Sequence, residues 1–240
     1  MLVKRLPRAN NNIIMKKDII LCGVGGQGIL SIATIIGEAA TAAGLNLKQA
    51  EVHGMSQRGG DVQSNLRLST DIIYSDLIPM GEADVIISME PMEALRYLPY
   101  LSKDGAVVTS SQSFVNIPNY PDSSAIDAEL AKLPKVAKLD IEQIAKEVAT
   151  VRSANVVLLG MAAPYIGILS TDELRSAVAR VFQRKGDAIV EANLKAFDAG
   201  VAAVGLSFIL IHSETPNTLN ATNITIIPKT TNPLKPNKTR

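Results

Sequence analysis

Short apolar runs and longer amphipathic segments alternate along most of the chain. Residues 19–22 form an apolar run of the length typical of a buried strand, and residues 28–43 carry apolar side chains almost all round, as expected of a helix packed on a sheet. Gly44 suits a helix C-terminus, and residues 45–52 follow as a second strand. These segments together predict a compact strand–helix–strand unit.

The alternation continues downstream. Residues 62–68 alternate apolar and polar side chains, which predicts a half-buried strand. Further strands are predicted at 83–90, 105–111 and 135–140, and helices at 91–101, 123–133, 141–148, 155–163, 171–180 and 187–205. Strands that alternate with helices through short connections predict an α/β fold, and we expect a Rossmann-like three-layer fold with a largely parallel sheet.

The two ends of the chain lack this periodicity. The stretch PRANNN at residues 7–12 is polar and without periodicity, and residues 1–15 are predicted to be a disordered extension, with Met15 a plausible true start. Residues 206–240 are rich in Asn, Thr and Pro and are predicted to be a disordered tail without a catalytic role; His212 lies there. The sequence therefore predicts one folded unit at 16–205.

Composition narrows the classes of function. Of the 240 residues, 47% are hydrophobic and 20% are charged, so the chain can bury a packed core. A net charge of +1 argues against nucleic acid as a partner. No apolar run reaches the roughly 18 residues of a membrane span, and the N-terminus lacks the apolar region of a signal peptide. We therefore expect no membrane contact.

The only cysteine is Cys22, within the first predicted strand. One thiol cannot form an internal disulfide, the usual kind of zinc site, or the ligand set of an iron–sulfur cluster. We expect no metal site in this chain, a cytoplasmic location, and a role for Cys22 as a small core residue.

A glycine cluster joins the first strand to the first helix. Gly23, Gly25 and Gly28 match the G-x-G-x-x-G pattern, in which glycines form a tight turn, admit a pyrophosphate and let the helix pack on the strand. Glu51 ends the second strand, where an acid that binds the nucleotide ribose would lie. Gly26 and Gln27 fit either a nucleotide site or a turn that merely packs tightly, so the residues alone leave both interpretations open.

A second polar motif, EVHGMSQRGGDV, spans residues 51–62. It follows the second strand directly, so we expect it at the carboxyl edge of the sheet, beside the glycine cluster, where open α/β sheets hold ligands. Arg58, before a glycine pair, suits phosphate or carboxylate, although it could instead pair with a surface acid. The candidate residues of this loop are His53, Ser56, Gln57, Arg58, Gly59 and Gly60.

A third motif, SMEP, brings Glu90 to the same edge. A plain structural interpretation is slightly favoured, because an acid before a helix that starts with Pro91 is favourable for the helix dipole. The sequence contains no Cys-x-x-Cys, no histidine-rich metal set and no G-x-S-x-G motif, and it singles out no catalytic residue.

At these residues the sequence resembles a known family. The stretches GVGGQGIL, EVHGMSQRGGDV and GEADVIISMEPMEALRYLPYL resemble the gamma-type subunit or domain of the 2-oxoacid:ferredoxin oxidoreductases. The resemblance covers about residues 16–205 and is greatest to the small (beta) subunit of the indolepyruvate branch. It does not extend to the first 15 residues or to the tail.

The resemblance implies a role as one part of a larger enzyme. Such enzymes decarboxylate a 2-oxoacid oxidatively, make an acyl-coenzyme A and reduce ferredoxin. The resemblance places thiamine diphosphate and iron–sulfur clusters in the large (alpha) subunit, with no cofactor bound by this chain alone and coenzyme A as co-substrate. It implies that residues 23–28 and 53–60 face the large subunit, with coenzyme A contact there as a hypothesis, and that ferredoxin is reached through the complex. The isolated chain is expected to expose an apolar patch and to be able to form homodimers.

Two other functions remain open from the residues alone. One is a stand-alone NAD(P)-dependent oxidoreductase that uses the glycine cluster and Glu51, and the other is an assembly module that contacts no ligand. Binding of NADH by the isolated chain distinguishes the first of these from the subunit interpretation.

Overall fold

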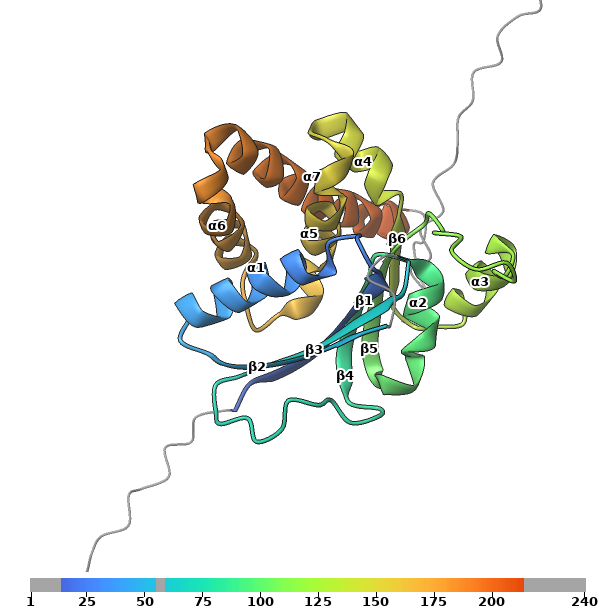
Figure 1. Cartoon of the computed structure of the whole chain (residues 1–240), viewed down its shortest axis with the longest axis horizontal. Helices are drawn as coiled ribbons and strands as arrows, with labels where there is room; N and C mark the ends of the chain where they lie inside the picture. The colour runs from blue at the N-terminus through green and yellow to red at the C-terminus, as the bar shows by residue number, and fades with distance from the viewer. Residues whose placement is uncertain (1–13, 55–58, 214–240) are drawn as a thin grey trace, which may run out of the picture.

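A single sheet crosses the centre of the computed structural model, which describes residues 14–54 and 59–213, with the backbone alone described for His53 and 206–213 (Figure 1). In the described residues the strand order is β2-β3-β1-β4-β5-β6. The strands are β1 (Lys16–Val24), β2 (Asn46–His53), β3 (Asp61–Ser69), β4 (Ala83–Ser88), β5 (Leu101–Ser110) and β6 (Val136–Leu139).

The pairing directions confirm a largely parallel sheet. Strand β1 pairs in parallel with β4, β4 with β5, and β5 with β6, whereas β3 is antiparallel to both of its neighbours. Strand β2 therefore runs in the direction of β1 but does not touch it, and the predicted compact strand–helix–strand unit is wrong in this respect. The short connection 54–60 closes β2 and β3 into a hairpin, and this hairpin inserts β3 beside β1.

Helices cover the two faces of the sheet unequally (Figure 1). One face carries α1 (Ile29–Ala42), α4 (Ile141–Val148), α5 (Ala154–Ile166), α6 (Thr171–Phe182) and α7 (Asp187–Ser213). The other carries α2 (Pro91–Arg96) and α3 (Ser123–Leu130). Each face buries its own apolar core, with Ile19, Leu21 and Val85 in the first and Ile20, Cys22 and Ile86 in the second. The structure thus has the expected three layers.

Helix α5 is the centre of the larger layer. It lies between the sheet and α7, and nearly all of its side chains are buried, as its continuous apolar sequence predicts. Two glycines permit the close approach to α7: a Cβ at Gly160 would lie 2.1 Å from the Phe197 carbonyl oxygen, and one at Gly200 would lie 2.1 Å from the Val157 carbonyl oxygen. The two helices consequently cross with their backbones nearly in contact.

A buried ion pair fastens the opposite, amino-terminal edge of β1. Asp18 is fully buried, and Arg67 of β3 donates from Nε to Oδ1 at 2.8 Å and from Nη2 to Oδ2 at 3.1 Å. Arg67 Nη1 also donates to the carbonyls of Ser75 and Leu77 at 3.1 and 2.9 Å. One guanidinium therefore ties the long β3–β4 connection, residues 70–82, to the sheet.

Some boundaries differ from prediction. The predicted helix at 91–101 ends at Arg96, a 3-10 turn covers Leu98–Tyr100, and β5 begins at Leu101 instead of 105. Pro99 within this turn has no N–H to continue an α-helix. Helix α7 reaches Ser213, so its backbone continues past residue 205. The proposed limits of the two terminal segments stay predictions. None of the helices in the described part of the chain is long and apolar enough to cross a membrane.

Candidate functional site

The two glycine-containing loops meet at the carboxyl edge of the sheet. Gly25 N donates to Gly60 O at 2.8 Å, and Gly59 N donates to Gly25 O at 3.5 Å. The structure therefore brings together the two segments that the sequence singled out separately. Three of the predicted site residues, Ser56, Gln57 and Arg58, lie outside the described residues, as does the side chain of His53.

The glycine turn is fixed by its own side chains and by α5. Gln27 N donates to Val24 O at 3.1 Å, and Gln27 Oε1 accepts from Val24 N at 2.7 Å, so this predicted site residue holds the turn closed. Gly28 precedes α1 with a φ of 87°, and a Cβ there would lie 2.7 Å from Asn155 Nδ2. Asn155 Nδ2 donates to Gly28 O at 3.1 Å. The turn requires glycine at 28 and is fastened to the first turn of α5.

A cleft of about 760 Å³ opens beside the glycine turn. Its walls come from the glycine turn, the end of β5, residues 150–155 and the start of α7. Helices α1 and α5 both begin at this cleft, so backbone N–H groups with partial positive charge lie at its edge. The size falls within the range of cofactor and substrate sites.

The charged side chains of the cleft are mainly basic. Arg152 and Lys185 line it, opposed by the single acid Glu142 among the lining residues that the structure describes. Lys185 Nζ lies 5.2 Å from the centre of the Phe182 ring. Cationic side chains next to helix N-termini form a setting that attracts anions. The arrangement suits a phosphate or carboxylate group on a ligand with apolar parts.

Sequence reasoning missed both of these cations. Arg152 lies just before the buried helix that was predicted at 155–163, and a basic residue near a helix N-terminus is unfavourable for the helix dipole. That mismatch is a signal that could have identified it. Lys185 carries no comparable signal, because the packing of α6 and α7 brings it to the cleft.

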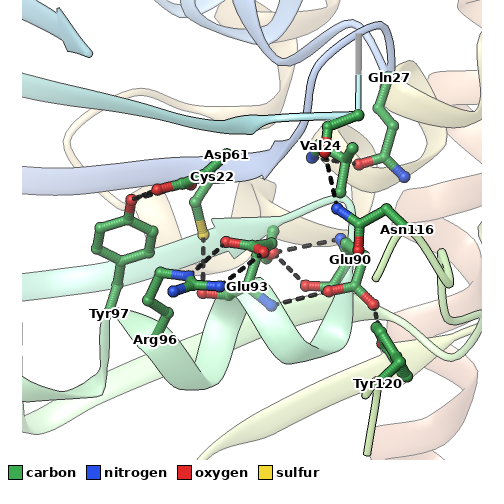
Figure 2. A network of polar contacts seen from close by, with 12 residues as sticks. Cys22, Val24, Gln27, Asp61, Glu90, Glu93, Arg96, Tyr97, Asn116 and Tyr120 are labelled. Atoms are coloured by element: carbon green, nitrogen blue, oxygen red, sulfur yellow. Dashed lines mark hydrogen bonds and ion pairs between the residues drawn. The ribbon is translucent and has the colours of Figure 1, made fainter. Parts of the chain in front are cut away.

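A polar network occupies the same edge on the side of α2 (Figure 2). Glu90 is fully buried and caps α2, since its Oε2 accepts from Glu93 N at 2.8 Å. Its Oε1 accepts from Phe114 N at 3.3 Å and from the Tyr120 hydroxyl. The favoured interpretation of Glu90 as a helix-entry residue is confirmed, and the contacts with residues 114 and 120 add a second task. Burial, together with the bond to Glu90, raises the pKa of Tyr120.

The remaining members of the network are structural pairs. Glu93 is almost fully buried and accepts from Arg96 Nε at 2.9 Å; burial raises the pKa of Glu93, and Arg96 opposes this rise. The Tyr97 hydroxyl donates to Asp61 Oδ2 at 2.9 Å. Cys22 is fully buried, and burial raises the pKa of its thiol, so the expectation of an inert core cysteine is confirmed.

The geometry required by the NAD(P) alternative is absent from the described strands. In that arrangement the ribose acid ends the strand next to β1, whereas here β3 separates β1 from β2, which carries Glu51. Glu51 is exposed on this edge strand, where its carboxylate accepts from Gln49 Nε2. Among the residues that the structure describes, no cluster of His, Cys, Asp or Glu could hold a metal ion.

Comparisons with known proteins agree with this architecture. Residues 18–203 match the family model described as pyruvate ferredoxin/flavodoxin oxidoreductase. The chain is 40% identical over 195 residues to indolepyruvate oxidoreductase subunit IorB of Pyrococcus horikoshii, covering 78% of this chain and 95% of that protein.

Solved structures share the fold. The keto/oxoacid ferredoxin oxidoreductase gamma subunit of Geobacter sulfurreducens superposes with a TM-score of 0.59 at 25% identity, over 79% of this chain and 99% of that chain. A 2-oxoglutarate:ferredoxin oxidoreductase chain of Magnetococcus marinus has the fold as one part of a longer polypeptide, with a TM-score of 0.62 at 24% identity over 80% of this chain and 31% of that chain. The resemblance seen in the sequence motifs is confirmed: this chain belongs to the pyruvate ferredoxin/flavodoxin oxidoreductase family.

Proposed function

We propose that this chain is the small subunit of a two-subunit oxidoreductase that acts on indolepyruvate or related aryl pyruvates. The observation that carries the proposal is the 40% identity to an indolepyruvate oxidoreductase subunit over 95% of its length. The balanced reaction takes a 2-oxoacid, coenzyme A and two oxidised ferredoxins to an acyl-coenzyme A, carbon dioxide, two reduced ferredoxins and a proton.

We assign thiamine diphosphate and the iron–sulfur clusters to the large subunit. The only cysteine of this chain, Cys22, is buried in the core and cannot ligate a cluster by itself. Thiamine diphosphate would supply the carbanion chemistry of decarboxylation within the large subunit. The contribution of this chain is then to complete the complex and to bind the co-substrate.

We place the phosphates of coenzyme A in the cleft beside the glycine turn. The support is chemical: Arg152, Lys185 and the N-termini of α1 and α5 converge there, while apolar lining residues suit the rest of an elongated ligand. Gly59 and Gly60 adjoin the glycine turn through their bonds to Gly25. Arg58 directly precedes Gly59 in the sequence, and we propose that it also contacts these phosphates. Ferredoxin would dock on the assembled complex, and the location would be cytoplasmic.

Removing the Arg152 side chain should weaken the binding of coenzyme A but not the binding of the 2-oxoacid. In the complete complex, Arg152→Ala is expected to raise the KM for coenzyme A about tenfold, since a charge-assisted hydrogen bond contributes roughly 1.5–3 kcal/mol. The KM for the 2-oxoacid should stay within about twofold, which steady-state kinetics measure directly. The control is Arg184→Ala, which removes the neighbour of Lys185 that does not line the cleft. An unchanged coenzyme A KM in both Arg152→Ala and Arg58→Ala would contradict the placement.

Anaerobic reconstitution tests the function itself. The chain is mixed with its cognate large subunit, and reduction of a low-potential dye is followed with indolepyruvate, phenylpyruvate or pyruvate, with and without coenzyme A. Turnover of aryl pyruvates only when both chains and coenzyme A are present is the expected result. Chains that do not associate, together with NADH binding by this chain alone, would favour the dehydrogenase alternative. Loop variants that assemble and turn over normally would leave a pure assembly module.

A further inference from the structure

Three exposed apolar side chains stand together on the connection between β5 and α3. Residues 111–120 of this connection have the sequence SQSFVNIPNY, without a charged residue; the single charge of the whole connection, 111–122, is Asp122 next to α3. Phe114, Val115 and Ile117 are 45%, 70% and 37% exposed, and we call residues 114–117 the apolar tip. Exposed apolar groups that gather in this way on an uncharged segment are typical of an interaction site.

The apolar tip is held in place by a buried carboxylate. Glu90 Oε1 accepts hydrogen bonds from the backbone N–H of Phe114, the first residue of the tip, and from the hydroxyl of Tyr120, three residues after it. Figure 2 shows Glu90 with Tyr120 beside it. A fully buried carboxylate that accepts hydrogen bonds from a surface loop holds the backbone of that loop in one conformation. These bonds stabilise the backbone conformation in which the side chains of the tip are exposed.

A second bond joins the tip to the hairpin loop. Asn116 Nδ2 donates to Gly59 O at 2.8 Å, and Gly59 is in turn bonded to Gly25 of the glycine turn. Phe114 also lines the cleft, together with Gln112. The tip is thus continuous with all three parts of the candidate site: the glycine turn, the hairpin loop and the cleft.

We propose that the apolar tip is the element through which this subunit docks on the large subunit, by inserting Val115 and Ile117 into an apolar groove of that chain. The proposal rests on the proposed function, because it presumes that the large subunit is the partner. Its position supports this occupant, since a chain that covers the tip also becomes the outer wall of the cleft. A loop already fixed in its exposed conformation loses little entropy on binding. In the Magnetococcus chain, moreover, the same fold is part of a longer polypeptide and not a free unit.

The test measures the dissociation constant between the two purified subunits by biolayer interferometry. Val115→Asp should raise the Kd at least about 30-fold, because it buries a charge in an apolar groove. The matched control is Ile72→Asp, whose target is 65% exposed in the connection 70–82 at the opposite edge of the sheet; its Kd should stay within about threefold of the native value. Both variants should keep the native melting temperature, because both positions are exposed.

A third variant tests the contribution of the hydrogen bond between Tyr120 and Glu90, which helps to hold the tip in place. Tyr120→Phe removes the hydroxyl bonded to Glu90 but leaves the exposed side chains in place, so we expect a Kd raised about three- to tenfold through lost preorganisation. A Kd that Val115→Asp leaves unchanged would overturn the proposal. An increase in Kd as large in Ile72→Asp as in Val115→Asp would overturn it as well. Sedimentation of this chain alone provides a further check: a homodimer that Val115→Asp dissociates would assign the tip to a second copy and also overturn it. If the native subunits do not associate at all, the proposed function fails first.

Discussion

Gly160→Ala is expected to destabilise the isolated subunit by about 3 kcal/mol or more. The added Cβ would lie 2.1 Å from the Phe197 carbonyl oxygen and 3.1 Å from Val201 N, and both are backbone atoms of α7. Backbone in the middle of a helix cannot rotate away as a side chain can. Helices α5 and α7 must therefore separate, which opens the core beneath them.

A glycine-to-alanine substitution on the partner helix α7 provides the control. A Cβ at Gly205 would meet no atom within 4 Å, so Gly205→Ala should be neutral or stabilising by up to about 1 kcal/mol, because alanine favours helix. Urea unfolding followed by circular dichroism compares the two midpoints. Equal midpoints for Gly160→Ala and Gly205→Ala would mean that the helices do not cross as closely as described.

Asp18→Asn should be the other severe substitution, with a loss of about 3–5 kcal/mol. The amide keeps the shape of the fully buried Asp18 side chain but leaves the guanidinium of Arg67, whose side chain is only 13% exposed, without its carboxylate. Because Arg67 also holds the carbonyls of Ser75 and Leu77, residues 70–82 should become more accessible to proteases. Thermal melting and limited proteolysis measure the two effects.

An exposed arginine–aspartate pair with the same two-bond geometry is the control for burial, although Asp18 has a second cation, Lys16, at 2.9 Å. Arg175 donates to Asp198 at 2.8 and 2.9 Å, but the two side chains are 45% and 49% exposed. Asp198→Asn should therefore cost about 1 kcal/mol or less. A similar loss from Asp18→Asn and Asp198→Asn would contradict the argument. The double variant Asp18→Asn with Arg67→Met should recover part of the loss, since it removes the unpaired charge.

The local pattern of apolar and polar residues was sufficient to predict most helices and strands and the fold class. The apolar run at 19–22, the glycine turn and the apolar segment that became α1 each report their structure through near neighbours in sequence. The same holds for Glu90 before Pro91 and for the buried helix α5. The order of strands was not available in this way, because nothing in residues 62–68 states that the resulting strand will lie between β1 and β2.

The candidate site also has parts that local sequence motifs predict and parts that depend on long-range packing. The glycine turn and the hairpin loop are visible as motifs, and their contact through Gly25 and Gly60 follows from the carboxyl edge that both share. Arg152 and Lys185 reach the cleft only through the packing of α5, α6 and α7, a long-range outcome. The apolar tip at 114–117 could not be predicted either, because its conformation depends on the long-range bonds of Phe114 to Glu90 and of Asn116 to Gly59.

The walls of the cleft have a consequence for biosynthesis. They run from Gly26, near the start of the described residues, to Asn193 on α7. A ribosome must therefore release α7 before the cleft exists, and no nascent fragment that ends earlier can hold the ligand. Because α7 also covers α5, a chain that lacks it exposes a largely apolar helix and becomes a target for chaperones or proteases. A chain therefore acquires both its cleft and the cover of its α5 core only once α7 has been synthesised.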